Sequence, residues 1–297
     1  MSRSGFATII GRPNVGKSTL LNQIVGTKVS ITAPSPNTTR AAVRGVWTEG
    51  DVQVIFVDTP GLHRPRTSLG GRLNETARAA AGDVDALIAM VEAGAPIGPG
   101  DRMVLATLFQ SAANTDTRCC VVVNKVDRTS RGEVAAQLSA AVAALEEIAE
   151  GAEAASRIEY FPVSAKTGVG VDELVAYVAA AMPDSPFLYP DEEVSDVPEA
   201  VWVAELVREQ LVRKTRQELP HSIHCRVSEF EWPHVTVEIL VERESQKGMV
   251  IGKGGQLLKD VGIAARRQLP EGCFLELRVR VEPGWQSRAE VLDRLGY

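Results

Sequence analysis

The stretch GRPNVGKSTLLN, Gly11–Asn22, directly follows the apolar run Phe6–Ile10. The apolar run predicts a buried strand, and the residues from Ser18 onward predict the start of a helix. Two glycines between them let backbone N–H groups surround phosphate oxygens, Lys17 adds a positive charge, and the Ser18 hydroxyl suits Mg²⁺. An ordinary glycine turn is the alternative, which this position disfavours. We therefore expect a triphosphate-binding loop made of Gly11, Arg12, Pro13, Asn14, Val15, Gly16, Lys17, Ser18 and Thr19.

The composition is that of an ordinary globular chain. Its 297 residues suffice for about two domains, and 44% of them are hydrophobic. No apolar run reaches the ~18 residues that span a bilayer. The N-terminus shows no signal-peptide cleavage site, so we expect a cytoplasmic protein. The four cysteines and four histidines lack zinc or redox spacing, which favours reduced thiols over a metal centre.

Charge is distributed unevenly along the chain. The formal net charge is −6, and residues 1–198 hold 17 basic and 23 acidic side chains. Residues 199–297 hold 15 of each. Overall charge therefore gives no argument for binding nucleic acid, and any RNA site must be a local basic patch.

Strand patterns alternate with helical patterns in the first part of the chain. This order predicts an α/β fold with a mostly parallel sheet and helices on both faces. Glu49–Asp51 predicts a hairpin turn, and residues 134–150 and 171–181 predict helices. The expected strands are Phe6–Ile10, Val43–Trp47, Val52–Val57, Ala86–Val91, Cys120–Val123 and Ile158–Val163.

The composition changes around Met182–Pro198, which holds four prolines and five acidic residues. We expect a nucleotide-binding domain over residues 1–182, a linker over 183–198 and a second domain over 199–297. The second domain has the pattern α-β-β-α-α-β followed by a short terminal helix. Its expected elements are Glu199–Leu219, Ser222–Phe230, His234–Val241, Ser245–Val250, Gln256–Leu269, Leu275–Val281 and a helix from about Gln286.

Three further motifs follow expected strands, at the sheet edge where open α/β folds bind ligands. In Asp58–Gly61, a carboxylate can hold Mg²⁺ through water and the Gly61 N–H can reach a γ-phosphate. In Asn124–Asp127, the last carboxylate can accept hydrogen bonds from guanine N1–H and N2–H, which adenine lacks. Ser164–Lys166 can bring a backbone N–H to guanine O6.

Each motif alone is weak, but their order is specific. Together they resemble the G domain of the translation-factor-like class of P-loop GTPases, which implies GTP and GDP as ligands. The residues expected to contact the nucleotide beyond the phosphate loop are Asp58, Thr59, Pro60, Gly61, Asn124, Lys125, Asp127, Ser164, Ala165 and Lys166.

Two segments are expected to move with the nucleotide state. Ala33–Arg40 predicts a Pro-rich surface loop, in which Thr39, favoured over Thr38, closes over the γ-phosphate. His63–Gly71 predicts a second mobile loop. The expected Mg²⁺ ligands are Ser18, Thr39 and Asp58.

Leu62 stands where Ras-like enzymes carry a water-orienting glutamine. Its side chain cannot hydrogen-bond, so we expect slow intrinsic hydrolysis or a water oriented by another group. Asn14 is either a simple loop residue or, as in related GTPases, part of a K⁺ site that stabilises transition-state charge. The residues expected to act in hydrolysis are Asn14, Lys17, Thr39 and Gly61.

A second glycine motif, G-x-x-G, occurs at Gly252–Gly255 between two expected helices. Alone it predicts a tight turn, but in this element order it is typical of KH domains, where it approaches the sugar-phosphate chain of RNA. Between Arg243 and Arg267, six basic residues accompany two acidic ones, which supplies the local patch. The expected RNA contacts are Arg243, Lys247, Ile251, Gly252, Lys253, Gly254, Gly255 and Lys259.

Nearly the whole chain resembles the Era family of bacterial ribosome-assembly GTPases. The resemblance is carried by GRPNVGKSTLLN, the threonine pair before Arg40, DTPGLH, NKVD, SAK, VER-x-x-Q-K-x-MVIG and the terminal LGY. It implies a P-loop GTPase domain, a type II KH domain of α+β class, Mg²⁺-dependent GTP hydrolysis, and binding of the 3′ end of 16S rRNA during 30S subunit maturation. It also implies peripheral association with the inner face of the cell membrane, although no lipidation motif stands out. No obligate protein partner is evident.

Two alternatives stay open at this point. The second domain can serve as a docking fold for a protein or membrane partner, and the basic patch beside Gly252–Gly255 speaks for RNA instead. An ATP-dependent kinase is the other alternative, and it conflicts with the carboxylate of Asp127.

Overall fold

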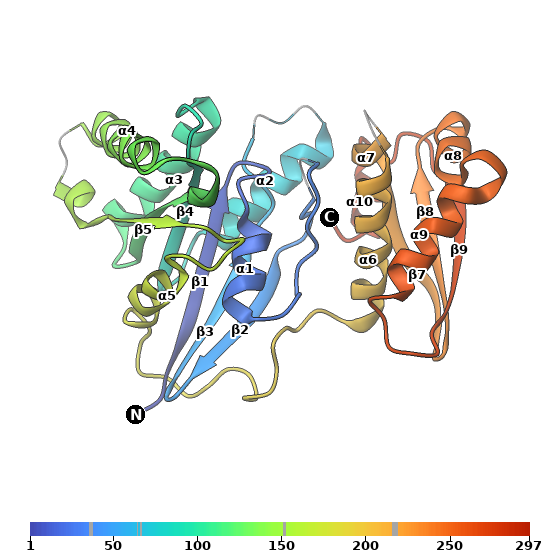
Figure 1. Ribbon diagram of the computed structural model, residues 1–297, viewed down its shortest axis with the longest axis horizontal. Coiled ribbons are helices and arrows are strands. Elements are labelled where there is room, and N and C mark those ends of the chain that lie inside the picture. Colours follow the sequence, from blue (N-terminus) through green and yellow to red (C-terminus); the bar gives the residue numbers. More distant parts are fainter. Residues whose placement is uncertain (36–37, 64, 66, 151–152, 216–218) are drawn as a thin grey trace. The chain divides into compact units, whose positions relative to one another are not determined.

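The computed structural model describes residues 1–35, 38–63, 65, 67–150, 153–215 and 219–297 (Figure 1). The chain forms two compact units, each of which is described by itself. The first unit consists of Met1–Ser30, Thr39–Arg66 and Gly70–Asp196. The second consists of Ile31–Thr38, Thr67–Leu69 and Val197–Tyr297.

The first unit is built on a six-stranded sheet with the order β2-β3-β1-β4-β5-β6. Strand β2 is antiparallel to β3, and all other neighbours are parallel, which confirms the expected mostly parallel α/β fold. Each expected strand overlaps an observed one. The strands are β1 (Arg3–Gly11), β2 (Val43–Glu49), β3 (Val52–Asp58), β4 (Ala86–Glu92), β5 (Arg118–Asn124) and β6 (Glu159–Val163).

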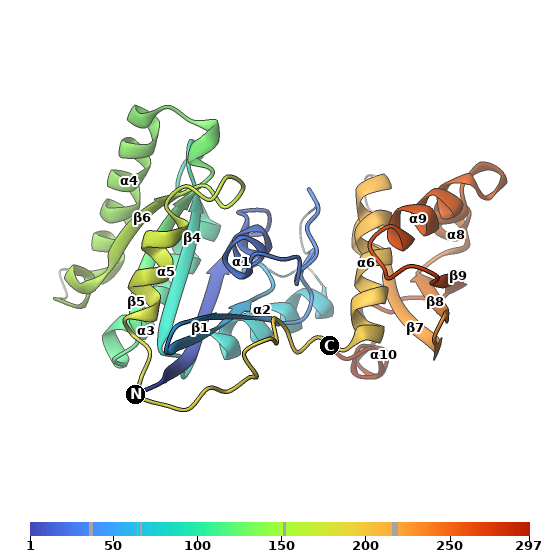
Figure 2. The same cartoon turned by 60° about the horizontal axis from the view of Figure 1, so that its bottom comes forward.

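Helices cover both faces of this sheet (Figures 1 and 2). Neighbouring strand residues alternate between the faces, so the adjacent Cys119 and Cys120 belong to different core clusters. One cluster includes residues of α1 (Lys17–Val25) and α5 (Val171–Ala179). The other includes residues of α2 (Ser68–Ala80), α3 (Pro99–Asn114) and α4 (Arg131–Ala149). Two short 3₁₀ turns, Val126–Arg128 and Glu153–Arg157, complete the unit.

Helix α2 occupies part of the segment 63–71 that the sequence analysis predicts as a mobile loop. The helix begins at Ser68 because Leu69, Leu73 and Ala77 follow at helical spacing and are all buried. Residues 64 and 66 of the expected loop lie outside the described residues, as do residues 36 and 37 of the other expected loop.

The segment expected as a linker is bound to the first unit through residue 196. The Ser4 hydroxyl donates to the Pro186 carbonyl at 2.6 Å, and the Val46 N–H donates to the Val194 carbonyl at 3.0 Å. The Gln53 side chain accepts hydrogen bonds from the N–H groups of Leu188 and Tyr189. These hydrogen bonds hold against the first unit a stretch that the sequence predicts as a linker.

The second unit contains a three-stranded sheet with the order β7-β8-β9, in which β8 pairs antiparallel with β7 and parallel with β9. Apolar residues of α6, α8 and α9 share one core cluster with the sheet. The expected α-β-β-α-α-β order is observed with one additional short helix, α7, before β7, and α6 ends at Lys214, whereas the sequence predicts a helix as far as Leu219. The elements are α6 (Glu199–Lys214), α7 (Leu219–Ser222), β7 (His224–Glu231), β8 (His234–Val241), α8 (Glu244–Ile251), a 3₁₀ turn (Lys253–Gly255), α9 (Gln256–Arg266), β9 (Phe274–Val281) and α10 (Ala289–Arg294).

The cysteines are all free thiols, three of them buried and Cys273 half-buried. Within the described ranges, no group of His, Cys, Asp and Glu side chains is arranged to hold a metal ion. No helix in the described part of the chain has the length and apolar character that a membrane crossing requires.

Candidate functional site

The predicted phosphate loop connects β1 to α1. Strand β1 ends at Gly11, and α1 begins at Lys17. The Lys17 ammonium donates to the carbonyl oxygens of Gly11 and Arg12 at 3.2 and 3.1 Å. Burial lowers the pKa of Lys17 to about 8, and the nearby charge of Asp58 opposes this shift. A buried ammonium at a helix N-terminus is suited to bind an anion.

Three side-chain oxygens converge beside this loop. The Ser18 hydroxyl donates to Oδ2 of Asp58 at 2.6 Å, and Thr39 Oγ1 donates to the same oxygen at 3.1 Å. The two hydroxyl oxygens are 2.9 Å apart. Burial raises the pKa of Asp58, whereas Lys17 and the hydroxyl donors lower it.

Asp58 is fully buried, and its Oδ1 has no hydrogen-bond partner among the described residues. Hard oxygen donors, including a carboxylate with an unused oxygen, are the groups that Mg²⁺ prefers. The residues present therefore fit a magnesium ion, which Ser18, Thr39 and Asp58 would hold.

Ser30 also belongs to this cluster, although no sequence motif indicated it. Its hydroxyl donates to Oδ2 of Asp58 at 2.9 Å. The Asn22 side chain fixes Ser30, because Oδ1 accepts from the N–H groups of Val29 and Ser30 at 2.9 Å and Nδ2 donates to the Ser30 carbonyl at 2.8 Å. The available signal was the amide of Asn22, one helical turn after Ser18.

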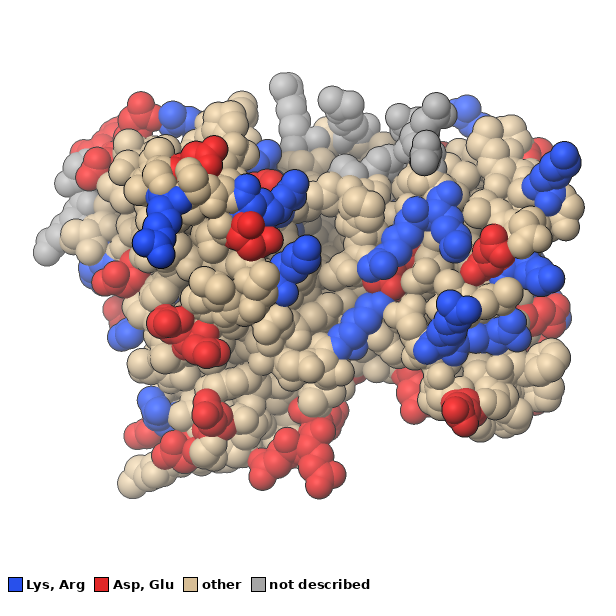
Figure 3. Space-filling view, in the orientation of Figure 1, with Lys and Arg blue, Asp and Glu red and all other residues tan. Residues whose placement is uncertain are grey.

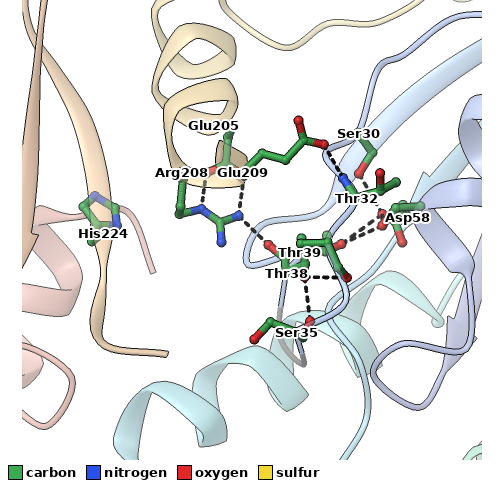
Figure 4. Close-up of polar contacts among 12 residues, drawn as sticks. Ser30, Thr32, Ser35, Thr38, Thr39, Asp58, Glu205, Arg208, Glu209 and His224 are labelled. Carbon is green, nitrogen blue, oxygen red and sulfur yellow. Dashed lines mark hydrogen bonds and ion pairs between the residues drawn. The ribbon is translucent and has the colours of Figure 1, made fainter. Parts of the chain in front are cut away.

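The two adjacent threonines have different partners. Thr39 is buried and contacts Asp58, whereas the Thr38 hydroxyl donates to the Ser35 carbonyl at 2.7 Å (Figure 4). The structure thus places Thr39, and not Thr38, with the other expected metal ligands.

The turn after β3 lies against the phosphate loop. A Cβ atom at Gly61 would lie 2.6 Å from the backbone N of Pro13, so only glycine permits this approach. The Thr59 hydroxyl donates to the Ile9 carbonyl at 2.7 Å, and Thr59 and Pro60 are buried. The structure thus gives these two side chains a packing role.

Leu62, the residue after this turn, is fully buried within the core cluster that contains α2 and α3. Its N–H donates to the Gly11 carbonyl at 3.1 Å. The backbone of Leu62 therefore supports the phosphate loop while its side chain packs in the core.

The expected base-binding residues meet at the ends of β5 and β6. The Ser164 hydroxyl donates to Oδ1 of Asp127 at 2.7 Å. Asn124 is buried; its Nδ2 donates to the Val15 carbonyl at 2.8 Å, and its Oδ1 accepts from the Ala165 N–H at 2.9 Å. Asn124 therefore connects the phosphate loop to the Ser164–Lys166 turn and uses the Ala165 N–H to do so.

Two other predicted contact residues, Lys125 and Arg12, form ion pairs with carboxylates of the first unit. The Lys125 ammonium lies 2.8 Å from a carboxylate oxygen of Glu92. Arg12 Nε donates to Oδ1 of the buried Asp101 at 2.6 Å. Exposed Asn14 has a left-handed backbone with φ +64°. Thr19 is half-buried within α1.

The predicted RNA motif lies between α8 and α9. Gly252 has φ +74° and Gly254 has φ +60°, so both residues occupy the left-handed region. A Cβ at Gly252 would lie 2.7 Å from Cβ of Leu257, whereas open space surrounds Gly254. The loop is therefore a tight turn whose middle is bare backbone, accessible to a large ligand. Lys253 is exposed at its centre.

Basic side chains accompany this loop. Arg243, Lys253 and Lys259 are exposed, while Lys247 and Ile251 are half-buried. Figure 3 shows Lys and Arg side chains gathered over the helical layer of the second unit. The local patch expected from the sequence is thus present at the surface of the unit.

Comparisons with known proteins match both parts of the chain. A family model described as 50S ribosome-binding GTPase matches residues 6–125, and a KH domain model matches residues 218–286. GTPase Era of Mycobacterium avium is 44% identical over 306 residues, covering 99% of each chain. GTPase Era of Mycobacterium tuberculosis H37Rv is 45% identical over 305 residues, covering 99% of this chain and 98% of the relative.

Two solved structures are similar along their full length. One is a crystal structure of Era in complex with MgGDPNP and nucleotides 1506–1542 of 16S ribosomal RNA. Its TM-score is 0.88 at 35% identity, covering 100% of this chain and 99% of that one. The other is a substituted Era from Aquifex aeolicus bound to GDP·AlF₄⁻, with a TM-score of 0.87 at 34% identity and 99% coverage of both chains.

Proposed function

This chain belongs to the Era family of GTPases, and we propose that it is a GTP-hydrolysing switch that binds the 3′ end of 16S rRNA and assists 30S subunit maturation. The solved relative with MgGDPNP and an rRNA fragment supports both ligands. The observation that carries the proposal is the convergence of Ser18, Thr39 and Asp58. Together with the ammonium of Lys17, these oxygens suit a triphosphate and its magnesium ion.

Asp127 is assigned to guanine recognition. Its carboxylate accepts from guanine N1–H and N2–H, and the hydrogen bond from Ser164 orients it for that task. The Ala165 N–H is already donated to Asn124, so we assign the neighbouring N–H of Lys166 to guanine O6.

Hydrolysis is proposed to be accelerated by groups that stabilise negative charge on the phosphates. Ser18, Thr39 and Asp58 would hold a Mg²⁺ ion that neutralises negative charge on the triphosphate. Lys17 adds a second positive charge, and the Gly61 N–H is assigned to the γ-phosphate. The buried Leu62 side chain leaves the attacking water without a partner at the position where Ras-like enzymes have a glutamine. We further propose that exposed Asn14 helps to hold a K⁺ ion beside the phosphates.

The RNA site is assigned to the KH domain, residues 199–297. The bare backbone of Gly252–Gly255 permits close approach of a sugar-phosphate chain, and Lys253 supplies a charge for it. The alternative is that this domain binds a protein in place of RNA. The surrounding basic residues favour a polyanion.

The two sites are proposed to be coupled, because a switch requires that nucleotide state change RNA affinity. Any such coupling is reciprocal, so RNA must also change the affinity for GTP relative to GDP. Equal RNA affinity with GDP and with a non-hydrolysable GTP analogue would refute this part of the proposal.

Two measurements on nucleotide-stripped, full-length protein test the proposal. Calorimetry with Mg²⁺ should register binding of GDP and none of ADP. A labelled RNA with the sequence of the 16S 3′ end should bind, and a scrambled RNA of equal length should bind more weakly. Absence of heat with GDP would overturn the GTPase assignment, and equal binding of both RNAs would overturn the rRNA assignment.

A cytoplasmic location and peripheral membrane association are also proposed, both from the family resemblance. Co-sedimentation with vesicles that contain anionic lipid tests the membrane contact. Protein that stays in the supernatant at low salt, where charge attraction is strongest, contradicts it.

A further inference from the structure

Helix α6 carries two buried charged side chains in addition to its apolar face. Val203, Val207 and Leu211 pack into the core of the second unit. Glu209 lies on the opposite side of the helix and Arg208 lies at the edge of the apolar face, yet each is only 1% exposed. Burial of an ion is costly without polar partners. The groups that contact Arg208 and Glu209 therefore have to include polar ones.

The partner of Glu209 is the backbone of Ile31–Thr38, a segment that belongs to the same compact unit as α6. Oε1 of Glu209 accepts from the Thr32 N–H at 2.9 Å (Figure 4). Nη2 of Arg213 donates to the Thr32 carbonyl at 2.8 Å, and Nη2 also contacts Glu209 at 3.3 Å. Both backbone groups of one loop residue are thus bound by α6.

The partner of Arg208 lies at the other end of this segment. Its guanidinium donates to the Thr38 carbonyl, and its Nε donates to Oε1 of Glu205 at 2.7 Å. That carbonyl belongs to the planar peptide unit whose nitrogen is that of Thr39. A hydrogen bond that fixes the direction of the C=O group therefore also fixes the direction of the Thr39 N–H.

Thr39 contacts the expected magnesium ligands directly. Its Oγ1 lies 2.9 Å from the Ser18 hydroxyl and donates to Asp58 at 3.1 Å. The residue that follows the Thr38 carbonyl in the chain therefore supplies one of the oxygens assigned to the metal.

The second segment expected to respond to nucleotide shows a related contact. Thr67–Leu69 belongs to the same unit as α6. The Leu69 N–H donates to the Gln286 carbonyl at 3.1 Å. The backbone of both segments is thus hydrogen-bonded to other residues of the second unit. Because both segments make such contacts, the contact of Arg208 with Thr38 is less easily attributed to chance.

We propose that Arg208 and Glu209 are positioning residues for GTP hydrolysis, which hold the backbone at Thr38 and at Thr32 so that Thr39 faces the magnesium ion. This inference rests on the proposed function and names two residues that act on Thr39 through the chain segment that precedes it. Every contact described from Arg208 and Glu209 to the segment is to a backbone group, so it needs no particular loop side chain. No residue of this segment is charged, so its side chains offer no ion-pair partner to Arg208 or Glu209.

The test compares full-length variants in Mg²⁺-dependent nucleotide binding and hydrolysis. Arg208→Met removes the donor, and Arg226→Met is the matched control, because Arg226 pairs with Glu238 in the same unit and Glu238 keeps Arg280 as a partner. We expect Arg208→Met to lower kcat/KM for GTP by at least about tenfold, as one charged hydrogen bond predicts. The Kd for GDP should stay within about twofold, and Arg208→Lys should restore part of the activity.

A second pair of variants keeps the test decisive if Arg208→Met folds poorly. Glu209→Met loses the acceptor for the Thr32 N–H, whereas Glu209→Gln retains an amide oxygen there. We expect a selective loss for GTP in the first and near-normal kinetics in the second. Unchanged GTP kinetics in both Arg208→Met and Glu209→Met, or a parallel loss of GDP affinity, would overturn the inference. A wild-type protein that fails to bind GTP overturns the proposed function itself, and this inference with it.

Discussion

The Ser164 hydroxyl donates a 2.7 Å hydrogen bond to Oδ1 of Asp127, so a serine at the end of β6 orients the carboxylate that follows β5. The same sheet edge holds Asn124, whose side chain connects both turns to the phosphate loop. The orientation of Asp127 is thus fixed by a side chain of the protein itself. Preorganisation of this kind leaves less ordering to be done on binding.

Asp127→Asn should lower GDP affinity by at least about 100-fold. Two hydrogen bonds to a charged acceptor are lost, each worth about 1.5–3 kcal/mol, and an amide N–H faces guanine donors. The same variant should bind xanthosine diphosphate better than the wild type does, because xanthine has a carbonyl where guanine has its amino group. Calorimetry with both nucleotides measures the two affinities.

Ser164→Ala is the matched control for this experiment. It keeps the carboxylate and removes only the hydroxyl that orients it, so GDP affinity should fall by about tenfold or less. A loss as large as that of Asp127→Asn would mean that Ser164 has more than an orienting role.

Leu62→Gln should destabilise the protein without accelerating hydrolysis. The Leu62 side chain is fully buried among apolar residues, and placing an amide there without a partner costs about 1–3 kcal/mol. Chemical denaturation should report this loss, and single-turnover hydrolysis should stay within about twofold of the wild type. A rise in kcat of about tenfold would show that the glutamine reaches the water after all.

The sequence predicted the parts of the fold that depend on local pattern. The strands were found because buried parallel strands are continuous apolar runs, and the ligand motifs because they follow those strands. Helix α2 was partly assigned to a loop, since the glycines and charges of residues 63–71 conceal the buried Leu69 and Leu73. The sequence was sufficient to place each short motif at the end of a strand or the start of a helix. It was not sufficient to predict which groups the side chains of the motif contact.

The contacts that escaped prediction join residues far apart in the chain. Besides Glu205, Arg208 contacts a backbone carbonyl 170 residues earlier, and a backbone group has no residue type to recognise. Ser30 was missed for a similar reason, because only the fold brings it to Asp58. Sequence pattern therefore identifies the chemistry of the site, and the tertiary structure supplies the residues that hold it.

K⁺ should accelerate GTP hydrolysis relative to Na⁺ if Asn14 helps to hold a monovalent cation. Asn14 is exposed at the phosphate loop with φ +64°, and one added charge at the transition state is worth at least about tenfold in rate. We expect Asn14→Ala to remove the difference between the two salts while leaving the slow rate in Na⁺ unchanged. Equal wild-type rates in K⁺ and Na⁺ at the same ionic strength would eliminate the potassium site.

The thiols should react slowly in the native protein. Burial raises the pKa of Cys119 to about 11, and burial is also the main cause that raises the pKa of Cys120 and of Cys273. The thiolate is the reactive form. As long as the pH is below the pKa, each unit of increase in pH raises the thiolate fraction about tenfold, so labelling should accelerate from pH 7 to pH 9. A disulfide reagent should find Cys273 first, and all four thiols only after denaturation. Rapid labelling of several native thiols at pH 7 would contradict the packing described.

Gly254→Asp should abolish binding of the 16S 3′-end RNA and leave GTP hydrolysis intact. A carboxylate on the bare backbone of the G-x-x-G loop repels phosphates and occupies the space that the RNA chain needs. The control is Gly272→Asp, because Gly272 also has a positive φ and open space around it, so strain and charge change alike. A Lys253→Asp variant tests the charge contribution without backbone strain. Measured by titration of labelled RNA, a similar loss in Gly272→Asp would show that charge alone explains the effect, and undiminished binding in both loop variants would favour a protein partner for this domain.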